Sequence, residues 1–285
     1  MKIILIDSNP IIVKCWKLHY SHIVKYISRH NLQLIYPHDY QFHNLTIEDM
    51  IKSQTFTGTT SVVTPTNSLC YMGGGFDLYL LKGMLLGTNI TSYKHIENIL
   101  QHHQMTKHHG YLSPNTIYKI DLVKVFENQY DYKSSTIYQN WNLVEMAQLP
   151  TMVVPEMIHR MTHIFDGLWN LLHEYHGDAT DIDNLVIPGI GTGYGHLDEY
   201  ESTKLMIFTF FIYNLKLDST RLDQLRKSCL ILFFFNKDYH HLRNTSDIEE
   251  IENCIVTGYG KEKRKNLKED TIMEFEELFK CVKID

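Results

Sequence analysis

The sequence predicts an α/β fold in which helices cover both faces of a central sheet. Short runs rich in apolar and β-branched residues alternate with longer segments whose apolar residues recur at helical spacing. This alternation is typical of strands connected by helices. A length of 285 residues with 44% apolar residues allows a sizeable core, and a single domain over 1–285 is the simplest interpretation.

The predicted elements follow one another along most of the chain. Strands are expected at Lys2–Ile6, Leu32–Ile35, Ser61–Thr64, Thr116–Val123, Leu185–Ile187 and Leu230–Phe235. Helices are expected at Ile11–Ser21, Phe76–Leu86, Ser92–His103, Glu156–Tyr175 and Leu197–Tyr213. Loops or insertions are expected at Pro37–Thr60, with a short helical pattern at Ile47–Ile51, and at Thr106–Pro114 and Glu127–Gln139. The core is expected to end near residue 240, and 241–285 is a polar extension with a docking helix at Thr271–Val282.

Composition argues against several classes of function. The net charge of −6 does not favour non-specific nucleic-acid binding. No apolar run has the length of a signal peptide or a membrane span, so we expect a cytoplasmic or nuclear protein. The five cysteines lack C-x-x-C spacing, which disfavours a zinc site or a disulfide scaffold. The 17 histidines are interpreted mainly as a hydrated surface, so neither a metal nor a cofactor is expected.

The first candidate site element is the end of the first strand. Asp7 is expected at the carboxyl end of that strand, where ligands of open α/β sheets bind, and its carboxylate suits an exocyclic amine such as that of adenine. Asn9 and Pro10 predict a helix start that leaves the amides of Ile11 and Ile12 available to a ligand. The alternative is that Asp7 only helps to cap this helix.

Two glycine-rich loops form the second and third candidate elements. In the first, the strand ending at Thr64 leads through Asn67 into Gly73, Gly74 and Gly75 and then a helix beginning with Phe76 and Asp77. In the second, the strand ending at Ile187 leads into the run Pro188-Gly189-Ile190-Gly191-Thr192-Gly193-Tyr194-Gly195. Glycines before a helix let backbone amides approach an anion, and two such loops suggest a diphosphate. Neither loop has Rossmann or Walker spacing, and a plain structural turn remains an alternative for the glycine triplet.

The segment from Asn67 to Asp77 resembles the Asn–glycine-run–Asp segment of macro domains, which bind ADP-ribose. The likeness extends to Ile187–Gly195 and to Phe233–Tyr239, and it covers about residues 1–240. Within macro domains the chain is most similar to fungal ADP-ribose 1''-phosphate phosphatase-like proteins. The resemblance implies a three-layer α/β/α macro-domain fold with a mixed central sheet.

The resemblance also implies roles for individual residues. Adenine is expected near Asp7, with Phe235 or Asn236 near the adenine or its ribose. The diphosphate is expected along Gly191, Thr192, Gly193 and Tyr194, and the proximal ribose by Gly73–Gly75. Asn67 and Asp77 are the candidate catalytic residues: Asn67 orients the terminal ribose and Asp77 positions a water. The expected substrate is ADP-ribose 1''-phosphate or ADP-ribosylated protein. Two alternatives stay open, a reader that binds ADP-ribose without turnover and a scaffold that has lost the ligand.

Overall fold

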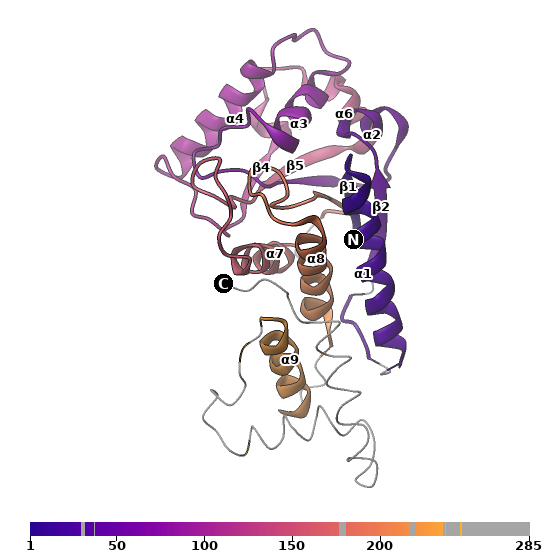
Figure 1. Cartoon of the computed structure of the whole chain (residues 1–285). Helices are drawn as coiled ribbons and strands as arrows, with labels where there is room; N and C mark the ends of the chain where they lie inside the picture. Colours follow the sequence, from indigo (N-terminus) through magenta and orange to yellow (C-terminus); the bar gives the residue numbers. More distant parts are fainter. Residues whose placement is uncertain are drawn as a thin grey trace. The chain divides into compact units, whose positions relative to one another are not determined.

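The structure, a computed structural model, describes residues 1–29, 32–36, 38–176, 181–216, 221–235, 237 and 246. The described residues form two compact units. One consists of residues 1–17 and 38–206, and the other of residues 18–37 and 207 onward. The first unit contains the sheet (Figure 1).

Six strands of the described residues form a mixed sheet in the order β2-β1-β6-β3-β5-β4. They are β1 (Lys2–Asp7), β2 (Asp39–Asn44), β3 (Thr60–Thr64), β4 (Tyr118–Asp121), β5 (Leu143–Gln148) and β6 (Asn184–Pro188). All neighbouring pairs are parallel except β4 and β5, which are antiparallel. The carboxyl ends of β1, β6 and β3 therefore lie side by side at one edge of the sheet, which is where open α/β sheets place their ligands.

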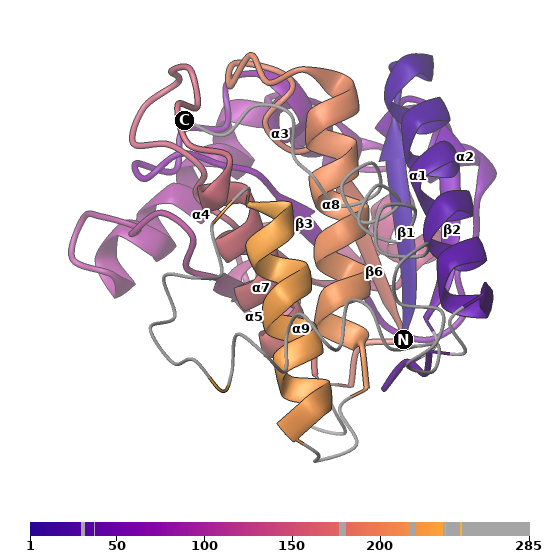
Figure 2. The same cartoon turned by 60° about the horizontal axis from the view of Figure 1, so that its bottom comes forward.

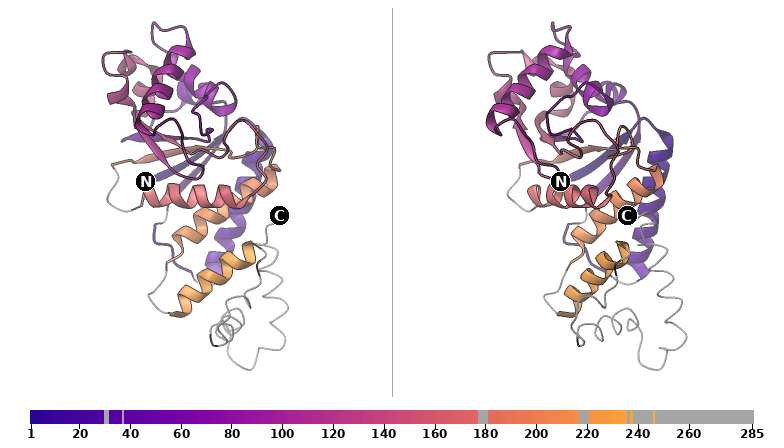
Figure 3. Two further views of the ribbon diagram at one scale, coloured as in Figure 1. Left: turned by 90° about the vertical axis from the view of Figure 1, so that its left-hand side faces the viewer. Right: turned by 60° about the vertical axis from the view of Figure 1, so that its left-hand side comes forward.

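Helices cover both faces of the sheet (Figures 1 and 2). One face carries α2 (Ile47–Ser53), α3 (Gly75–Leu85), α4 (Tyr93–Lys107), α5 (Leu122–Val125), η1 (Tyr132–Ser134) and α6 (Thr136–Trp141). On the other face lie α7 (Thr162–Glu174) and the first-unit residues of α1 (Pro10–Arg29) and α8 (Glu199–Asn214), as Figure 3 shows. The predicted three-layer α/β/α arrangement with a mixed sheet is confirmed. No helix among the described residues is both long and apolar enough to cross a membrane.

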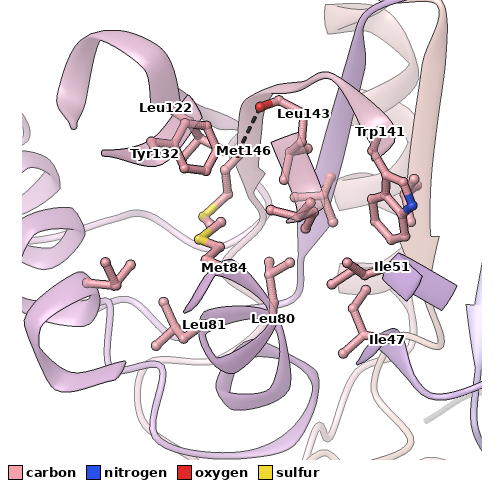
Figure 4. Close-up of a cluster of buried hydrophobic side chains, with 14 of the residues drawn as sticks. Ile47, Ile51, Leu80, Leu81, Met84, Leu122, Tyr132, Trp141, Leu143 and Met146 are labelled. Atoms are coloured by element: carbon pink, nitrogen blue, oxygen red, sulfur yellow. Dashed lines mark hydrogen bonds between the residues drawn. The ribbon is translucent and has the colours of Figure 1, made fainter. Parts of the chain in front are cut away.

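The core on the α3 face explains why these helices stay in place. Ile4, Val62 and Met146 extend from β1, β3 and β5, and all three are fully buried. Opposite them pack Leu80 and Met84 of α3, with side chains of α2 and α6 around them (Figure 4). Burial of an aliphatic side chain of this size contributes about 1.5–3 kcal/mol, so this cluster anchors the helix that follows the first glycine loop.

Two strands of the first unit were not predicted from the sequence. The strand β2 lies inside the predicted loop Pro37–Thr60. It was not recognised because its sequence DYQFHN is polar and it is only half-buried at the sheet edge. The strand β5 was not predicted at all, although Met146, Ala147 and Gln148 are buried. The predicted strand Thr116–Val123 is shorter than expected because Asp121 caps α5 by accepting a hydrogen bond from the Lys124 amide (2.9 Å).

In the second unit two strand predictions were wrong. The apolar run Leu230–Phe235 belongs to α9 (Arg221–Phe234) and the turn that follows it, where Leu230 and Phe234 are buried one helical turn apart. Phe234 stacks on Phe208 with ring centroids 3.8 Å apart. A short apolar run fits a buried helix as well as a strand, which explains the error. Leu32–Ile35 forms no strand, only an isolated bridge between Leu34 and Leu215. The predicted helix Thr271–Val282 lies outside the described residues.

Candidate functional site

A cavity of about 300 Å³ lies beyond the carboxyl ends of β3, β5 and β6. Since β3 is hydrogen-bonded to both β5 and β6, the segments after these three strands meet there. The lining residues come from all three segments: Pro65, Thr66, Asn67, Tyr71, Gly73, Gly74, Gly75, Phe76 and Asp77 after β3; Thr151, Met152 and Pro155 after β5; and Gly189, Gly191, Gly193, Tyr194 and Gly195 after β6. The structure thus brings the two glycine loops of the sequence together around one cavity.

The hydrogen bonding of the backbone amides in the first glycine loop changes at Gly73. Each backbone amide from Ser68 to Met72 donates a hydrogen bond within the protein. Within the described residues, the amides of Gly73–Asp77 donate none. Gly75, Phe76 and Asp77 form the first turn of α3, where the helix dipole adds to the attraction for an anion. Five consecutive unpartnered amides therefore line the cavity.

The second glycine loop presents a further set of amides. In the described part of the chain, those of Thr192, Gly193, Tyr194 and Gly195 donate no hydrogen bond, whereas those of His196 and Leu197 donate back to the loop. Gly191 has a φ of +80°, and a Cβ on it would lie 2.6 Å from Cδ1 of Leu197. This turn therefore requires glycine at position 191. Thr192 does not line the cavity, and neither does the exposed His196.

The start of the predicted helix Glu156–Tyr175 supports this second loop instead of forming a helix. The Ile158 amide donates to the Gly195 carbonyl oxygen (3.0 Å), and α7 begins only at Thr162. A Cβ at Gly195 would lie 2.7 Å from Cδ1 of Ile158. The segment before α7 thus packs directly beneath the loop that carries the unpartnered amides.

Asp77 is a buried acid at this cavity. Its residue is 6% exposed, and burial raises the pKa of its carboxyl group to about 7. The Thr66 hydroxyl lowers that pKa in part, although its geometry falls short of a hydrogen bond. Oδ1 of Asp77 accepts no hydrogen bond within the described residues, so a capping role for this oxygen is not seen. A carboxyl group with a pKa near neutrality is suited to accept or return a proton.

Two threonines share the environment of Asp77. Thr66 and Thr151 also line the cavity, are 2% and 4% exposed, and have hydroxyl groups without a partner in the described structure. They are neighbours because the pairing of β3 and β5 continues past both strands: the Thr151 amide donates to the Thr66 carbonyl oxygen (3.0 Å). Buried polar atoms without partners are costly, which makes this corner of the cavity a place for a polar ligand or water.

The side chain of Asn67 is used mainly to shape its own loop. Its Oδ1 accepts hydrogen bonds from the amides of Leu69 (3.1 Å) and Tyr71 (3.3 Å), and its Nδ2 donates to the Tyr71 carbonyl oxygen (2.7 Å). Asn67 lines the cavity but is only 5% exposed. One Nδ2 hydrogen is left for a ligand, whereas the side-chain oxygen is already engaged.

Asp7 lies next to the cavity without lining it. Its Oδ1 accepts the Asn9 amide (2.8 Å), and hydrogen bonds from Asn9 and Gly189 lower the carboxyl pKa, while burial, the larger effect, raises it. The Ile11 amide donates to Oδ1 of Asn9 (2.9 Å), so the prediction that this amide is free was wrong. The Ile12 amide makes no such bond among the described residues, and the Ile12 side chain is buried beside Gly189.

The last two residues predicted to contact the ligand are Phe235 and Asn236. Phe235 was expected near the adenine or its ribose, in a segment resembling the last core strand and its exit. It instead follows α9 in the second unit, and its ring packs against Phe234 with centroids 5.3 Å apart. Asn236 lies outside the described residues. No group of three His, Cys, Asp or Glu residues is arranged to hold a metal ion in the described part of the chain.

Four residues that line the cavity were not predicted as site residues: Thr66, Thr151, Met152 and Pro155. Because β5 was not predicted, the segment Leu149–Pro155 that follows it had no expected place in the sheet. Recognising Glu145–Gln148 as a strand next to β3 would have placed Thr151 beside Thr66.

Comparison with known proteins gives two findings. A family model described as a Macro-like domain matches residues 1–275. Among solved structures, one titled "Thermosipho africanus DarTG in complex with ADP-ribose" is similar at 19% identity with a TM-score of 0.37. The match covers 55% of this chain and 35% of that chain, so this protein spans about a third of the length of the matched structure.

Proposed function

We propose, from the premise that this chain belongs to the Macro-like domain family, that its cavity binds ADP-ribose or a close derivative. The observation that carries the proposal is the pair of amide runs, Gly73–Asp77 and Thr192–Gly195, on the two loops that line the cavity. Backbone amides at a helix start and in a glycine loop bind phosphate oxygens. A cavity of about 300 Å³ also falls within the range of small-molecule sites.

The chemistry of the lining orients the ligand. The diphosphate lies between the two runs of amides, and the terminal ribose lies against Asp77, Thr66 and Thr151, whose unpartnered polar atoms match ribose hydroxyls. The adenine then lies toward Asp7, which borders Gly189 at the edge of the cavity. Asp7 remains the candidate acceptor for the adenine amine.

We further propose hydrolysis at the terminal ribose, with ADP-ribose 1''-phosphate as one substrate. In that reaction ionised Asp77 accepts a proton from water as the water oxygen attacks phosphorus. The bond between phosphorus and the 1''-oxygen breaks, the proton passes to that oxygen, and ADP-ribose and phosphate are released. With ADP-ribosylated protein, ionised Asp77 accepts a proton from water as the water oxygen attacks C1'' of the terminal ribose. The bond between C1'' and the protein side chain breaks, the proton passes to that side chain, and free ADP-ribose is released. Ionised Asp77 repels a phosphate dianion beside it, which favours the protein-linked substrate as pH rises above about 7.

A reader that binds ADP-ribose without turnover is the second candidate, and one observation favours it. Asn67 was expected to orient the ribose, but its side-chain oxygen accepts hydrogen bonds from the amides of Leu69 and Tyr71. A site in which this oxygen is unavailable to orient the ribose can bind the ligand and still lack turnover.

Calorimetric titration with ADP-ribose, followed by product assays on the same samples, tests these proposals. Binding with phosphate released from ADP-ribose 1''-phosphate, or ADP-ribose released from modified protein, supports an enzyme if Asp77→Asn abolishes release. Binding without either product identifies a reader. A wild-type protein that does not bind ADP-ribose at millimolar concentrations refutes the proposed function.

A further inference from the structure

We propose that helix α4 positions the first glycine loop, with Glu97 as the main positioning residue of the ligand site. The expected effect on ligand binding rests on the proposed function. The claim that α4 orders the loop does not depend on it. Three polar side chains of α4 carry it, Glu97, Gln101 and Gln104. They recur at spacings of four and three residues and therefore share one face of the helix.

Glu97 makes the contact nearest to the unpartnered amides. Its Oε1 accepts a hydrogen bond from the Met72 amide (2.9 Å), directly before Gly73. Its Oε2 accepts from the Lys94 ammonium group (2.6 Å), which is itself largely exposed. Glu97 is only 3% exposed, so its carboxylate is a buried acceptor. It accepts from Met72, the last residue of the loop before Gly73 whose amide donates a hydrogen bond.

Gln101 and Gln104 hold the loop at two further points. Nε2 of Gln101 donates to the Leu69 carbonyl oxygen (3.0 Å). Nε2 of Gln104 donates to Oε1 of Gln148 (3.0 Å), the last residue of β5, and the Cys70 thiol donates to the same oxygen (3.4 Å). The helix thus joins the loop both directly and through the end of a central strand.

The backbone of the loop needs such support. Cys70 has a φ of +57°, in the left-handed region that residues with a Cβ avoid. A residue persists in such a conformation only where its surroundings hold it there. Asn67 ties the loop to itself, but only Glu97 among the described side chains bonds the Met72 amide. Loss of Glu97 is therefore expected to release Met72 and, with it, the orientation of the amides from Gly73 onward.

Hydrogen exchange of the ligand-free full-length protein tests the structural part. In Glu97→Ala we expect the amides of residues 69–72 to exchange about tenfold faster, since Met72 loses its acceptor. Glu97→Gln retains an oxygen acceptor for Met72 and is expected to exchange nearly as slowly as the wild type. The matched control is Glu48→Ala on α2, which removes an exposed i,i+4 partner of Lys52 without touching the loop.

Titration with ADP-ribose tests the consequence for the site. Glu97→Ala is expected to weaken binding about tenfold, which corresponds to about 1.4 kcal/mol, and Glu97→Gln and Glu48→Ala to stay within about twofold of the wild type. Gln101→Ala, a milder change, is expected to give an intermediate loss. This variant keeps the inference testable if Glu97→Ala fails to fold.

The two proposals fail in different ways. A wild-type protein that does not bind ADP-ribose refutes the proposed function, and the exchange data still decide whether α4 orders the loop. Unchanged exchange of residues 69–72 in both Glu97→Ala and Gln101→Ala overturns the positioning role, even where the wild type binds. Equal weakening of binding in Glu97→Gln and Glu97→Ala overturns the assignment to the Met72 hydrogen bond.

Discussion

The ring of Tyr194 lies directly against Gly74. A Cβ on Gly74 would come within 2.8 Å of both Cε2 and the hydroxyl oxygen of Tyr194. Tyr194 is 57% exposed, so its ring joins the two glycine loops at the surface. A side chain at position 74 would therefore require the Tyr194 ring to move.

Gly74→Ala is therefore expected to displace Tyr194 and weaken ADP-ribose binding about tenfold, with a stability change below about 1 kcal/mol because the ring is exposed. Calorimetry and urea unfolding measure the two effects. Tyr194→Ala removes the obstacle, so the double variant should bind like Tyr194→Ala alone. Fully additive losses in the double variant would refute this explanation.

The raised pKa of Asp77 predicts a pH-dependent gain in stability for Asp77→Asn. Between pH of about 4 and 7 the unfolded wild type releases this proton while the folded protein retains it, so wild-type stability falls as pH rises. We expect Asp77→Asn to exceed the wild type by about 2 kcal/mol or more at pH 8, and by less at pH 5. Urea unfolding at several pH values measures the difference. A difference that is constant with pH would show that Asp77 titrates normally.

The rate of turnover should also depend on the ionisation of Asp77, but it should rise with pH, whereas the stability of the wild type falls. The proposed base is ionised only above pH of about 7, so the rate of ADP-ribose release from modified protein is expected to rise through that pH and then level off. A rate profile measured at saturating substrate checks this. A rate that is already maximal at pH 5 would exclude Asp77 as the base.

Binding of ADP-ribose should depend weakly on salt. The residues that line the cavity are uncharged apart from Asp77, and the phosphates are assigned to backbone amides. Short-range hydrogen bonds in a cavity are less screened than exposed ion pairs. Affinity is expected to change less than about threefold between 50 and 500 mM NaCl. A fall of tenfold or more would point to a lysine or arginine in contact with the diphosphate.

Asp7→Ala should distinguish a contact to adenine from a purely structural role. If Asp7 accepts a bond from the adenine amine, the variant loses about tenfold in affinity for ADP-ribose and little for ribose 5-phosphate, which lacks the base. If Asp7 only holds Asn9 and Gly189 in place, both ligands lose affinity alike. Titration of both ligands decides between the two roles.

Sequence periodicity and glycine spacing were sufficient for much of the fold. The apolar runs of β1, β3 and β6 are buried on both faces, and such strands are recognisable without their neighbours. The helices α3 and α4 were predicted to within a few residues, except that α4 extends to Lys107. Both glycine loops were identified because glycine before a helix has a local meaning that needs no tertiary information.

Tertiary structure alone decided which segments meet. Nothing in the local sequence says that β3 lies between β5 and β6, yet this order places Thr151 beside Thr66 and both glycine loops around one cavity. The run at Leu230–Phe235 has the composition of a strand, but it continues a helix that begins at Arg221. The pKa of Asp77 likewise follows from burial, which depends on residues distant in sequence. Local patterns therefore determined the elements and the chemistry of the loops, while long-range packing determined their assembly into a site.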